Sequence, residues 1–290
     1  MALTDTLKAK QFAVIAEMET PKGVDVSDFV ANARQLKGRV AAVLVPDMGY
    51  AVMRLSAMAG AVLLKEQGLE PIVQFSCRDR NRLALQSDLL GAHLLGVNAV
   101  MAVVGEAVEM GDNLEATPVN DLDPKGFIRA AATLASGKDL GGKPLKGAPS
   151  FCLGARIEPW EGSAEAKERV GEAKAAVENG AQFLVTPPVF DLDALGEFLA
   201  SAGDMGAPVI GSVLLLKSVG MARYLNQNLK GVEVSEDTIR RIRAASDRPV
   251  ECVKIAAETV KGLQKICGGA LLVTTGWEDR LSAILDEAGF

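Results

Sequence analysis

We predict from the sequence an α/β fold, a (β/α)8 TIM barrel that forms a single domain over residues 1–290. Three observations favour it. Eight apolar runs of strand length alternate with helical patterns. The runs are nearly continuous, as in strands buried on both faces, and eight β/α units suit a chain of about 250 to 300 residues. A doubly wound sheet is the alternative, but its GxGxxG fingerprint should follow the first strand, where this chain has Pro-Lys-Gly-Val-Asp-Val at positions 21–26.

The expected elements follow one another in order along the chain. The runs predicted to form strands are 12–18, 41–45, 72–75, 99–104, 151–157, 183–188, 208–216 and 269–275. Helical patterns lie at 26–36, 53–69, 83–95, 124–135, 164–179, 192–202, 221–229, from 235, at 250–266 and at 278–288. Asp25 or Ser27 can cap the first helix, and Ser235 can cap the one that it begins. We expect 107–123, which is polar and rich in turn formers, to be a long functional loop, and 137–149 to be a Gly/Lys/Pro connection.

Two of the helical patterns, 53–64 and 83–95, are strongly apolar. We interpret their apolar residues as the stripes that face the strands of the barrel, because a surface helix buries one such stripe. An interface with another chain is the alternative reading.

Composition and charge exclude several classes of protein. The net charge is -6, and the 31 Lys and Arg residues form no basic run, which argues against binding to nucleic acid or to an anionic membrane. No window approaches 18 uninterrupted apolar residues, and the N-terminal residues lack the apolar core of a signal peptide. We therefore expect no membrane span and a cytoplasmic location.

Histidine and cysteine contribute little chemistry to this chain. The four cysteines, Cys77, Cys152, Cys252 and Cys267, form no CxxC pair, and His93 is the single histidine. This usage predicts free thiols in a reducing compartment, no metal site and no His-based triad. His93 lies inside a helical pattern, where we expect a packing or surface role. Carboxylates, Arg, Lys or a cofactor must then carry the chemistry.

Ionisable residues gather where the predicted strands end. Active sites of TIM barrels lie at the carboxyl ends of the strands, although a solvated rim would also be polar. The residues at these ends are Glu17, Glu19, Asp47, Arg78, Asp79, Glu106, Arg156, Glu158, Thr186, Lys217, Thr274 and Thr275.

Glu17 stands out because it comes before its strand has clearly ended. An acid behind Ile15 and Ala16 should be partly desolvated, which raises its pKa and suits it to donate a proton near neutral pH. The alternative is a Glu17 paired with a cation such as Arg78. Cys77 is a potential nucleophile, but a cysteine at a strand end is more often a small buried hydrophobe. One acid with no metal and no activated nucleophile points to chemistry carried by a bound organic cofactor.

Four blocks of sequence resemble the methylenetetrahydrofolate reductase family of flavin-dependent TIM barrels, and the resemblance covers about 12–290. The blocks are AEMETPKG at 16–23, SCRDRN at 76–81, LLGA at 89–92 with LGVN at 95–98, and NGAQFLVTPPVFD at 179–191. The SCRDRN block with its following helix is most similar to the branch found in acetogens and in fused homocysteine methyltransferase–reductases. The order and spacing of all four blocks carry the resemblance.

The resemblance implies a reaction. Glu17 would be the general acid that protonates N10 of 5,10-methylenetetrahydrofolate, so that the bridging methylene opens to an iminium. Reduced flavin N5 would then deliver a hydride to that carbon, which gives 5-methyltetrahydrofolate, a step of one-carbon metabolism and methionine biosynthesis. NAD(P)H or an electron-transfer protein would reduce the flavin again.

The resemblance also implies site residues and partners. FAD is the expected cofactor, with FMN as the alternative, and Glu106 would act beside Glu17 in catalysis. Pro187 and Lys217, together with both carboxylates, would line the folate site. We expect a homo-oligomer or a complex with an iron–sulfur partner subunit. The expected flavin contacts are Pro46, Gln74, Cys77, Arg78, Val104, Gly105, Glu106, Ala116, Thr117, Asp121 and Arg156.

Four positions depart from the family pattern. Glu106 stands where the family usually has Asp, and Pro187 stands where a Gln usually holds the pterin. Gln74 replaces a His before the turn of the third strand, and Ala176, with Lys174 nearby, replaces a Lys that contacts the flavin phosphates in some members. These departures leave two other hypotheses open. One is an enzyme for another one-carbon carrier or redox partner, and the other is a barrel subunit that docks a partner without activity of its own.

Overall fold

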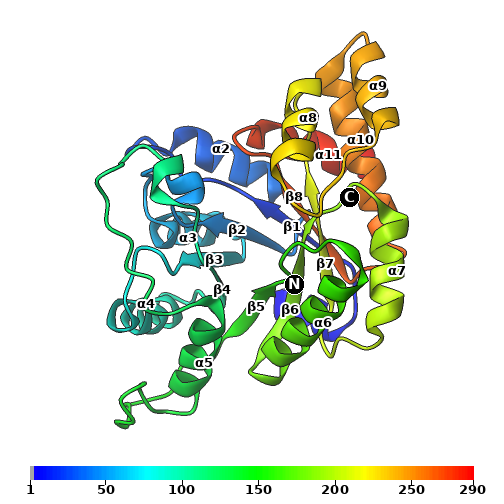
Figure 1. The fold of residues 1–290 in the computed structure, drawn as a ribbon. Coiled ribbons are helices and arrows are strands. Elements are labelled where there is room, and N and C mark those ends of the chain that lie inside the picture. The colour runs from blue at the N-terminus through cyan, green and yellow to red at the C-terminus, as the bar shows by residue number, and fades with distance from the viewer. Residues whose placement is uncertain (1–2) are drawn as a thin grey trace.

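Eight parallel strands close into a barrel in the computed structural model, which describes residues 3–290 (Figure 1). Each strand pairs with the next along the chain, and β8 pairs with β1 to complete the ring. The predicted TIM barrel and all eight predicted strands are confirmed. The strands are β1 (Ala13–Glu17), β2 (Ala42–Pro46), β3 (Pro71–Ser76), β4 (Ala99–Val103), β5 (Cys152–Arg156), β6 (Ala181–Pro188), β7 (Val209–Leu214) and β8 (Gly269–Val273).

Helices surround the barrel at the predicted places, and three of them, α8 to α10, separate β7 from β8 (Figure 1). The α-helices are α1 (Leu3–Lys8), α2 (Ser27–Leu36), α3 (Ala57–Glu66), α4 (Arg82–Leu94), α5 (Pro124–Ala135), α6 (Gly162–Glu178), α7 (Leu192–Ala202), α8 (Val219–Asn228), α9 (Glu236–Ala244), α10 (Arg248–Leu263) and α11 (Leu281–Ala288). Short 3-10 turns are η1 (Gly49–Ala51), η2 (Val108–Met110) and η3 (Glu278–Arg280). Ser235 caps α9 as predicted, whereas α2 has Val26 at its N-cap and no side-chain cap, although Asp25 accepts the Ser27 N–H at 3.0 Å.

The strand residues alternate between two cores. Ala13 and Ile15 belong to the inner core that fills the barrel, whereas Val14, Ala16 and Met18 belong to the outer core between strands and helices. The same alternation of two sides holds in the other strands. The inner core consists of Leu3, Ala13, Ile15, Ala42, Leu44, Ile72, Ala99, Met101, Cys152, Phe183, Val185, Ile210 and Leu271.

Helix α1 closes the amino-terminal end of the barrel, because Leu3 lies in the inner core with the first residues of the strands. The sequence pattern predicted no element there, since so short a helix shows no apolar period. The opposite end of the barrel, where the strands finish, stays open to solvent and carries the ionisable residues.

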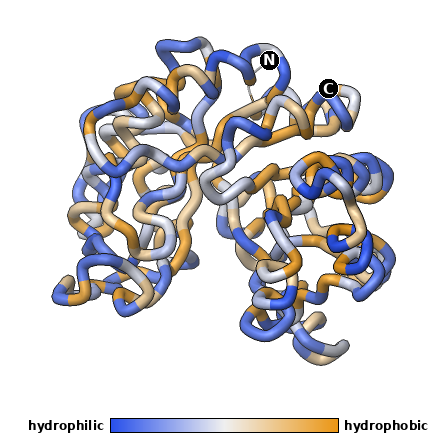
Figure 2. Tube along the Cα trace, turned by 90° about the horizontal axis from the view of Figure 1, so that it is seen from above, coloured by the Kyte–Doolittle hydropathy of each residue, from blue (hydrophilic) through white to orange (hydrophobic). Residues whose placement is uncertain are grey.

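Along the peripheral helices, hydrophobic and hydrophilic residues alternate within each turn (Figure 2), as expected for helices that bury one face. Helix α4 departs from the predicted inward stripe. Leu85 and Leu89 are buried, but Leu83 is 74 % exposed, Leu94 is 87 % exposed, and Leu90 and Leu95 are also exposed. The interpretation of 83–95 as one inward stripe was therefore wrong for four of its six leucines. No helix among residues 3–290 combines the length and apolar character that a membrane span needs.

The segment between β4 and α5 runs from the barrel mouth past η1 and then over the start of α4 (Figure 1). Asp112 pairs with Lys22 and accepts the Met53 N–H at 3.0 Å. Farther along, Asp121 accepts from Arg82 at 2.8 Å. The predicted long loop is thus fixed at both of its ends to the loops that surround the mouth.

Candidate active site

The alternation in the strands decides which predicted residues face the mouth. Glu17 continues the inward series of Ala13 and Ile15, and Arg156 follows Cys152 and Gly154 in the same way. Gln74 has the same parity as Ile72 and pairs with Pro46 of β2. These side chains therefore converge at the carboxyl end of the barrel.

Cys77 lies on the other side of the sheet. It packs in the outer core next to the helices, and its burial raises the pKa of the thiol to about 11. Any contact between Cys77 and a ligand at the mouth would have to come from the backbone.

Glu17 carries an unusual carboxyl. Within residues 3–290, no hydrogen bond or ion pair involves its side chain, so the alternative pairing with Arg78 is not found. Burial raises the pKa of Glu17 to about 8, with further increases from the charges of Glu19, Glu278 and Glu106 and an opposing effect of Arg156. A carboxyl with this pKa holds its proton at neutral pH and can donate it.

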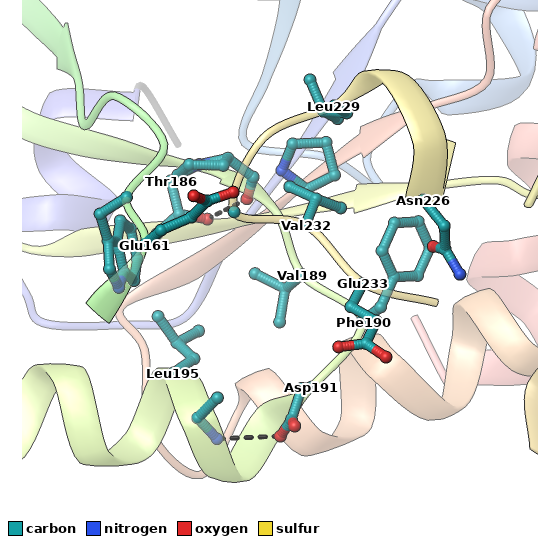
Figure 3. A pocket seen from close by; sticks show the side chains of 15 residues that line it. Glu161, Thr186, Val189, Phe190, Asp191, Leu195, Asn226, Leu229, Val232 and Glu233 are labelled. Atoms are coloured by element: carbon teal, nitrogen blue, oxygen red, sulfur yellow. Dashed lines mark hydrogen bonds between the residues drawn. The ribbon is translucent and has the colours of Figure 1, made fainter. Parts of the chain in front are cut away.

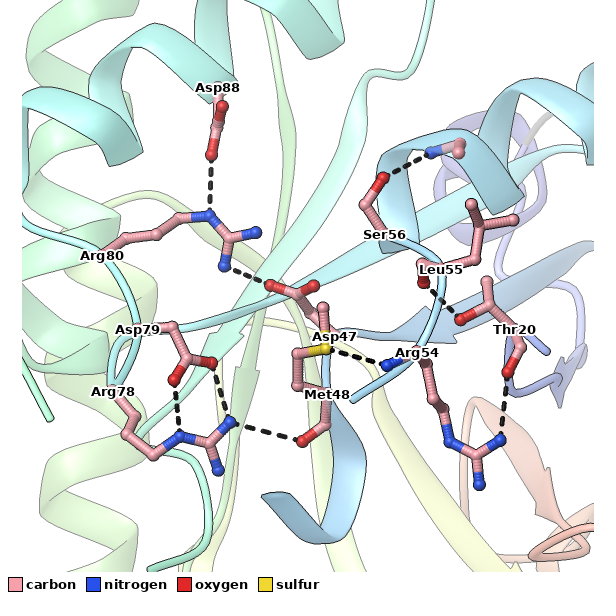
Figure 4. Close-up of polar contacts among 11 residues, drawn as sticks. Thr20, Asp47, Met48, Arg54, Leu55, Ser56, Arg78, Asp79, Arg80 and Asp88 are labelled. Carbon is pink, nitrogen blue, oxygen red and sulfur yellow. Dashed lines mark hydrogen bonds and ion pairs between the residues drawn. The ribbon is translucent and has the colours of Figure 1, made fainter. Parts of the chain in front are cut away.

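Arg78 supports the turn after β4. Its Nε and Nη2 donate to the two carboxylate oxygens of Asp79, each at 2.7 Å (Figure 4). Its Nη1 donates to the Glu106 carbonyl at 2.8 Å. Gly105 makes this arrangement possible, because its φ is +93° and a Cβ there would lie 2.6 Å from Ser76 Oγ. The guanidinium of Arg78 thus holds the backbone of Glu106 in place.

Tyr50 joins the site although the sequence analysis did not single it out. Its N–H donates to Glu106 Oε2 at 3.1 Å, and the residue is 47 % exposed at the mouth. Met48, Tyr50 and Ala51 have φ values of 51°, 56° and 56°, a left-handed conformation that non-glycine residues rarely adopt. Strained backbone of this kind gathers at functional sites, but residue types alone do not reveal it.

Asp47 was predicted at a strand end near the site, but its side chain points away from the site. Its side chain is buried and pairs with Arg80, which also donates to Asp88 at 2.8 Å (Figure 4). The guanidinium of Arg80 also lies 5.9 Å from the centre of the Phe75 ring. This group therefore ties the ends of β2 and β3 to α4, which is a structural role.

The loop residues predicted to contact a cofactor lie away from the carboxylates. Ala116 and Thr117 are exposed in a turn that the Ala116 N–H closes on the Asn113 carbonyl at 3.0 Å. Asp121 forms a paired hydrogen bond with Arg82, which lowers the pKa of Asp121 to about 2. The structure does not bring these three residues to Glu17.

Lys217 lies on the far side of the mouth, after β7. Its ammonium donates to the Thr275 carbonyl and lies 5.3 Å from the centre of the Trp277 ring. Thr275 has a φ of 46°, and the next turn is closed by the Gly276 N–H on Glu278 Oε1 at 3.1 Å. This loop brings Glu278 near Glu17, a neighbour that the sequence did not indicate.

Beside β6 lies a cavity of about 520 Å³ between α7 and the α8–α9 connection (Figure 3). Two of the residues singled out in the sequence, Thr186 and Pro187, line it. Its charged residues are Glu161, Asp191 and Glu233, with no Lys or Arg. An anionic ligand would therefore be repelled there, so this acidic cavity does not suit the carboxylate tail of a folate.

The model of one protein family, methylenetetrahydrofolate reductase, matches residues 2–275. The chain belongs to the methylenetetrahydrofolate reductase family. No curated protein matches it in sequence. The resemblance found in the four sequence blocks is thereby confirmed.

Solved structures of low sequence identity share the barrel of this family member. An uncharacterized Clostridium thermocellum protein that binds two copies of 5-methyl-5,6,7,8-tetrahydrofolic acid matches with a TM-score of 0.67 and 11 % identity, over 99 % of this chain and 97 % of that one. EDTA monooxygenase (EmoA) from Chelativorans sp. BNC1 matches with a TM-score of 0.56 and 11 % identity, over 96 % and 93 % of the two chains. At this identity the likeness shows the fold alone.

Members of this family generally depend on a flavin, and residues at the mouth fit such a group. Val104 is 56 % exposed after β4 and offers an apolar surface beside the half-buried Gly105. Arg156 is exposed and makes no ion pair with any of residues 3–290. Val104 and Arg156 line a cavity of about 230 Å³ beside Lys125 and Arg169, which both pair with Glu172, and its other carboxylates are Asp123 and Glu158. The apolar surface of Val104 suits a planar ring, and the unpaired Arg156 is the cation that is free to contact a phosphate.

Proposed function

We propose that the protein catalyses the flavin-dependent reduction of 5,10-methylenetetrahydrofolate to 5-methyltetrahydrofolate. The observation that carries the proposal is Glu17, a carboxyl without a counter-ion that keeps its proton to about pH 8 in the mouth of a family barrel. A structural neighbour that binds 5-methyltetrahydrofolic acid supports the class of substrate.

Glu17 would donate its proton to N10 of the bound folate, which opens the bridging methylene to an iminium carbon. A bound reduced flavin supplies the hydride for that carbon. Glu106 would lie against the same ligand, because the Arg78 guanidinium and the Tyr50 N–H hold its backbone and side chain at the mouth. Lys217 would contact the folate from the opposite rim.

Val104, Gly105 and Arg156, together with Pro46 and Gln74 at the ends of β2 and β3, would hold the proposed flavin. FAD is the proposed form, with FMN as the alternative, and the electrons would come from NAD(P)H or an electron-transfer protein. The visible spectrum of the purified protein tests this part. A flavin band that bleaches with NADH or 5-methyltetrahydrofolate supports the proposal, whereas a colourless protein that binds neither FAD nor FMN contradicts it.

The Glu17→Gln variant separates the acid from a structural role. The amide cannot supply the proton, so we expect folate turnover to fall by roughly 10²-fold or more. Reduction of the flavin by NAD(P)H should continue, because that step needs no proton on N10. Rapid-mixing measurements of the two half-reactions decide the matter, and an equal loss of both would mean that Glu17 is structural.

A second candidate function has its own observation. Pro187 is buried at the point where the family usually has a Gln for the pterin, and Glu278 adds a carboxylate to the mouth. A flavin-binding barrel for another one-carbon carrier, or one that docks a partner subunit, would have these features. In that case flavin would bind, but added folates would neither bleach nor shift its spectrum.

A further inference from the structure

Glu19 lies two residues beyond Glu17, where β1 has passed into the loop before α2. Side chains two positions apart in an extended chain point to the same side, and Met18 between them is fully buried in the outer core. The Glu19 side chain is only 9 % exposed. A second carboxylate is therefore held at the barrel mouth next to Glu17.

Arg54 fixes this carboxylate from the loop after β2. Its Nη2 lies 2.6 Å from Glu19 Oε2, and its Nη1 donates to the Thr20 carbonyl at 3.1 Å. The Thr20 hydroxyl donates to the Leu55 carbonyl at 2.6 Å (Figure 4). The Leu55 N–H donates to the Pro21 carbonyl at 2.9 Å. These bonds join the two loops, so the position of Glu19 is set by the fold.

The cations at the mouth are distributed unequally between the two carboxyls. Arg54 is bound to Glu19, Lys217 to the Thr275 carbonyl, and Arg78 to Asp79 and the Glu106 carbonyl. Among residues 3–290, no cation forms such a contact with Glu17, and Arg156 influences it only through its charge.

We propose that Glu19 is a positioning residue for Glu17: Arg54 fixes the Glu19 carboxylate beside Glu17, and the negative charge of Glu19 favours the protonated form of Glu17 at neutral pH. This inference rests on the proposed function, in which Glu17 is the general acid. Glu19 would touch neither the folate nor the flavin and would act only through Glu17.

All charged neighbours of the two carboxyls enter this argument. Burial is the largest cause of the raised pKa of Glu17, and the charge of Glu19 comes next, followed by Arg156 in the opposite direction and by Glu278 and Glu106. For Glu19, burial raises the pKa most, whereas Arg54 and Lys217 favour the charged form against Glu278 and Glu106. The pKa of Glu19 is raised overall, because burial outweighs the contact with Arg54, which is the largest influence in favour of the charged carboxylate.

Infrared difference titration tests the inference without turnover. The spectrum of each protein minus that of the same protein with Glu17→Gln isolates the protonated carboxyl of Glu17, whose midpoint should lie near pH 8 in the unmodified chain. In Glu19→Gln the midpoint should move to lower pH by roughly one pH unit, the effect of one lost like charge. Glu19→Asp keeps the negative charge, so its Glu17 midpoint should return most of the way to that of the unmodified chain.

Glu251→Gln is the matched control, because it also removes a glutamate from an ion pair with an arginine, here Arg241 on α9. It should leave the midpoint of Glu17 unchanged. Glu19→Gln leaves Arg54 unpaired and could fail to fold for that reason. Glu19→Gln combined with Arg54→Met removes both partners of the ion pair and should lower the Glu17 midpoint by the same amount. A folded variant that lacks Glu19 and keeps the original midpoint would overturn the inference.

The pH profile of folate reduction in a single turnover gives an independent readout. Its high-pH limb should move to lower pH in Glu19→Gln by the same amount as the infrared midpoint. A purely structural role would lower the rate at every pH and leave the limb in place, which would contradict the inference. If the unmodified protein does not reduce folate at all, the proposed function fails, and the infrared titration still decides the relation between Glu19 and Glu17.

Discussion

At the residue scale, the protonated carboxyl of Glu17 makes the stability of the fold depend on pH. The pKa of Glu17 is about 8 in the folded protein, against an ordinary value of 4.5 that the unfolded chain should show. The folded state therefore binds the proton more tightly, so this contribution is fully present below the unfolded value and is lost as the pH rises towards the folded one. Glu17→Gln keeps a neutral side chain at every pH.

We therefore expect Glu17→Gln to become more stable than the unmodified protein as the pH rises from about 5 to about 9, by roughly 2–4 kcal/mol in the free energy of unfolding. Urea denaturation across that range measures it. Glu172→Gln is the control, because the pKa of Glu172 is shifted in the opposite direction: the hydrogen bond to Lys125 lowers it. Its loss of stability should stay constant over the same range. If the difference in the free energy of unfolding between Glu17→Gln and the unmodified protein does not change with pH, the raised pKa of the buried Glu17 carboxyl is contradicted.

The sequence could predict some residues of the site but not others. Glu17 follows from one local pattern, an acid that continues an apolar strand. Tyr50, Glu278 and the pair of Glu19 with Arg54 depend on loops that are distant in sequence and meet only when the barrel closes. Their residue types are ordinary for solvated loops, so no local pattern separates them from their neighbours.

At the scale of the element, α4 shows where periodicity misleads. Its leucines recur at helical spacing, yet only Leu85 and Leu89 face the strands, because the helix packs on the barrel along a narrow line. Leu83, Leu90 and Leu94 are seven and four residues apart, so they repeat the same helical period on the outer side of the helix. The period of a pattern identifies a helix, but an apolar helix with two leucine faces does not reveal which one is buried.

Truncation of one leucine on each face of α4 distinguishes the two. Leu89→Ala leaves a cavity in the outer core and should lower the free energy of unfolding by roughly 2–5 kcal/mol. Leu94→Ala removes a side chain that is 87 % exposed and should change it by about 0.5 kcal/mol at most. Urea denaturation of both variants checks the pair. A large loss for Leu94→Ala would mean that another chain or segment covers this face.

At the scale of the whole molecule, the barrel was predictable because its evidence is repeated eight times. Each apolar run is ambiguous by itself, but eight of them in alternation with helices leave few arrangements. Closure between the last and the first strand is different, because it joins β8 to β1 across the entire chain. No local sequence pattern predicts that contact, and the feature that fits it is a small residue, Gly269, at the start of β8.

Gly269 marks the place where the closing strand has no room for a side chain. It pairs with Ala13 of β1 on one side and with Ile210 of β7 on the other. A Cβ at this position would overlap the Ala13 carbonyl oxygen and would lie 2.7 Å from Ile210 Cδ1. Gly269→Ala should therefore force the strands apart where the ring closes, and overpacking of this kind costs roughly 1–3 kcal/mol.

Gly91→Ala provides the matched control. Gly91 lies inside α4, where a Cβ would meet no atom within 4 Å, so alanine should raise stability by about 0.5–1 kcal/mol through its better helix propensity. The two glycine-to-alanine changes are then expected to move the urea midpoint in opposite directions. Equal stability of Gly269→Ala and the unmodified protein would show that β1 and β8 tolerate a wider spacing, and that the tight approach at Gly269 is not what closes the barrel.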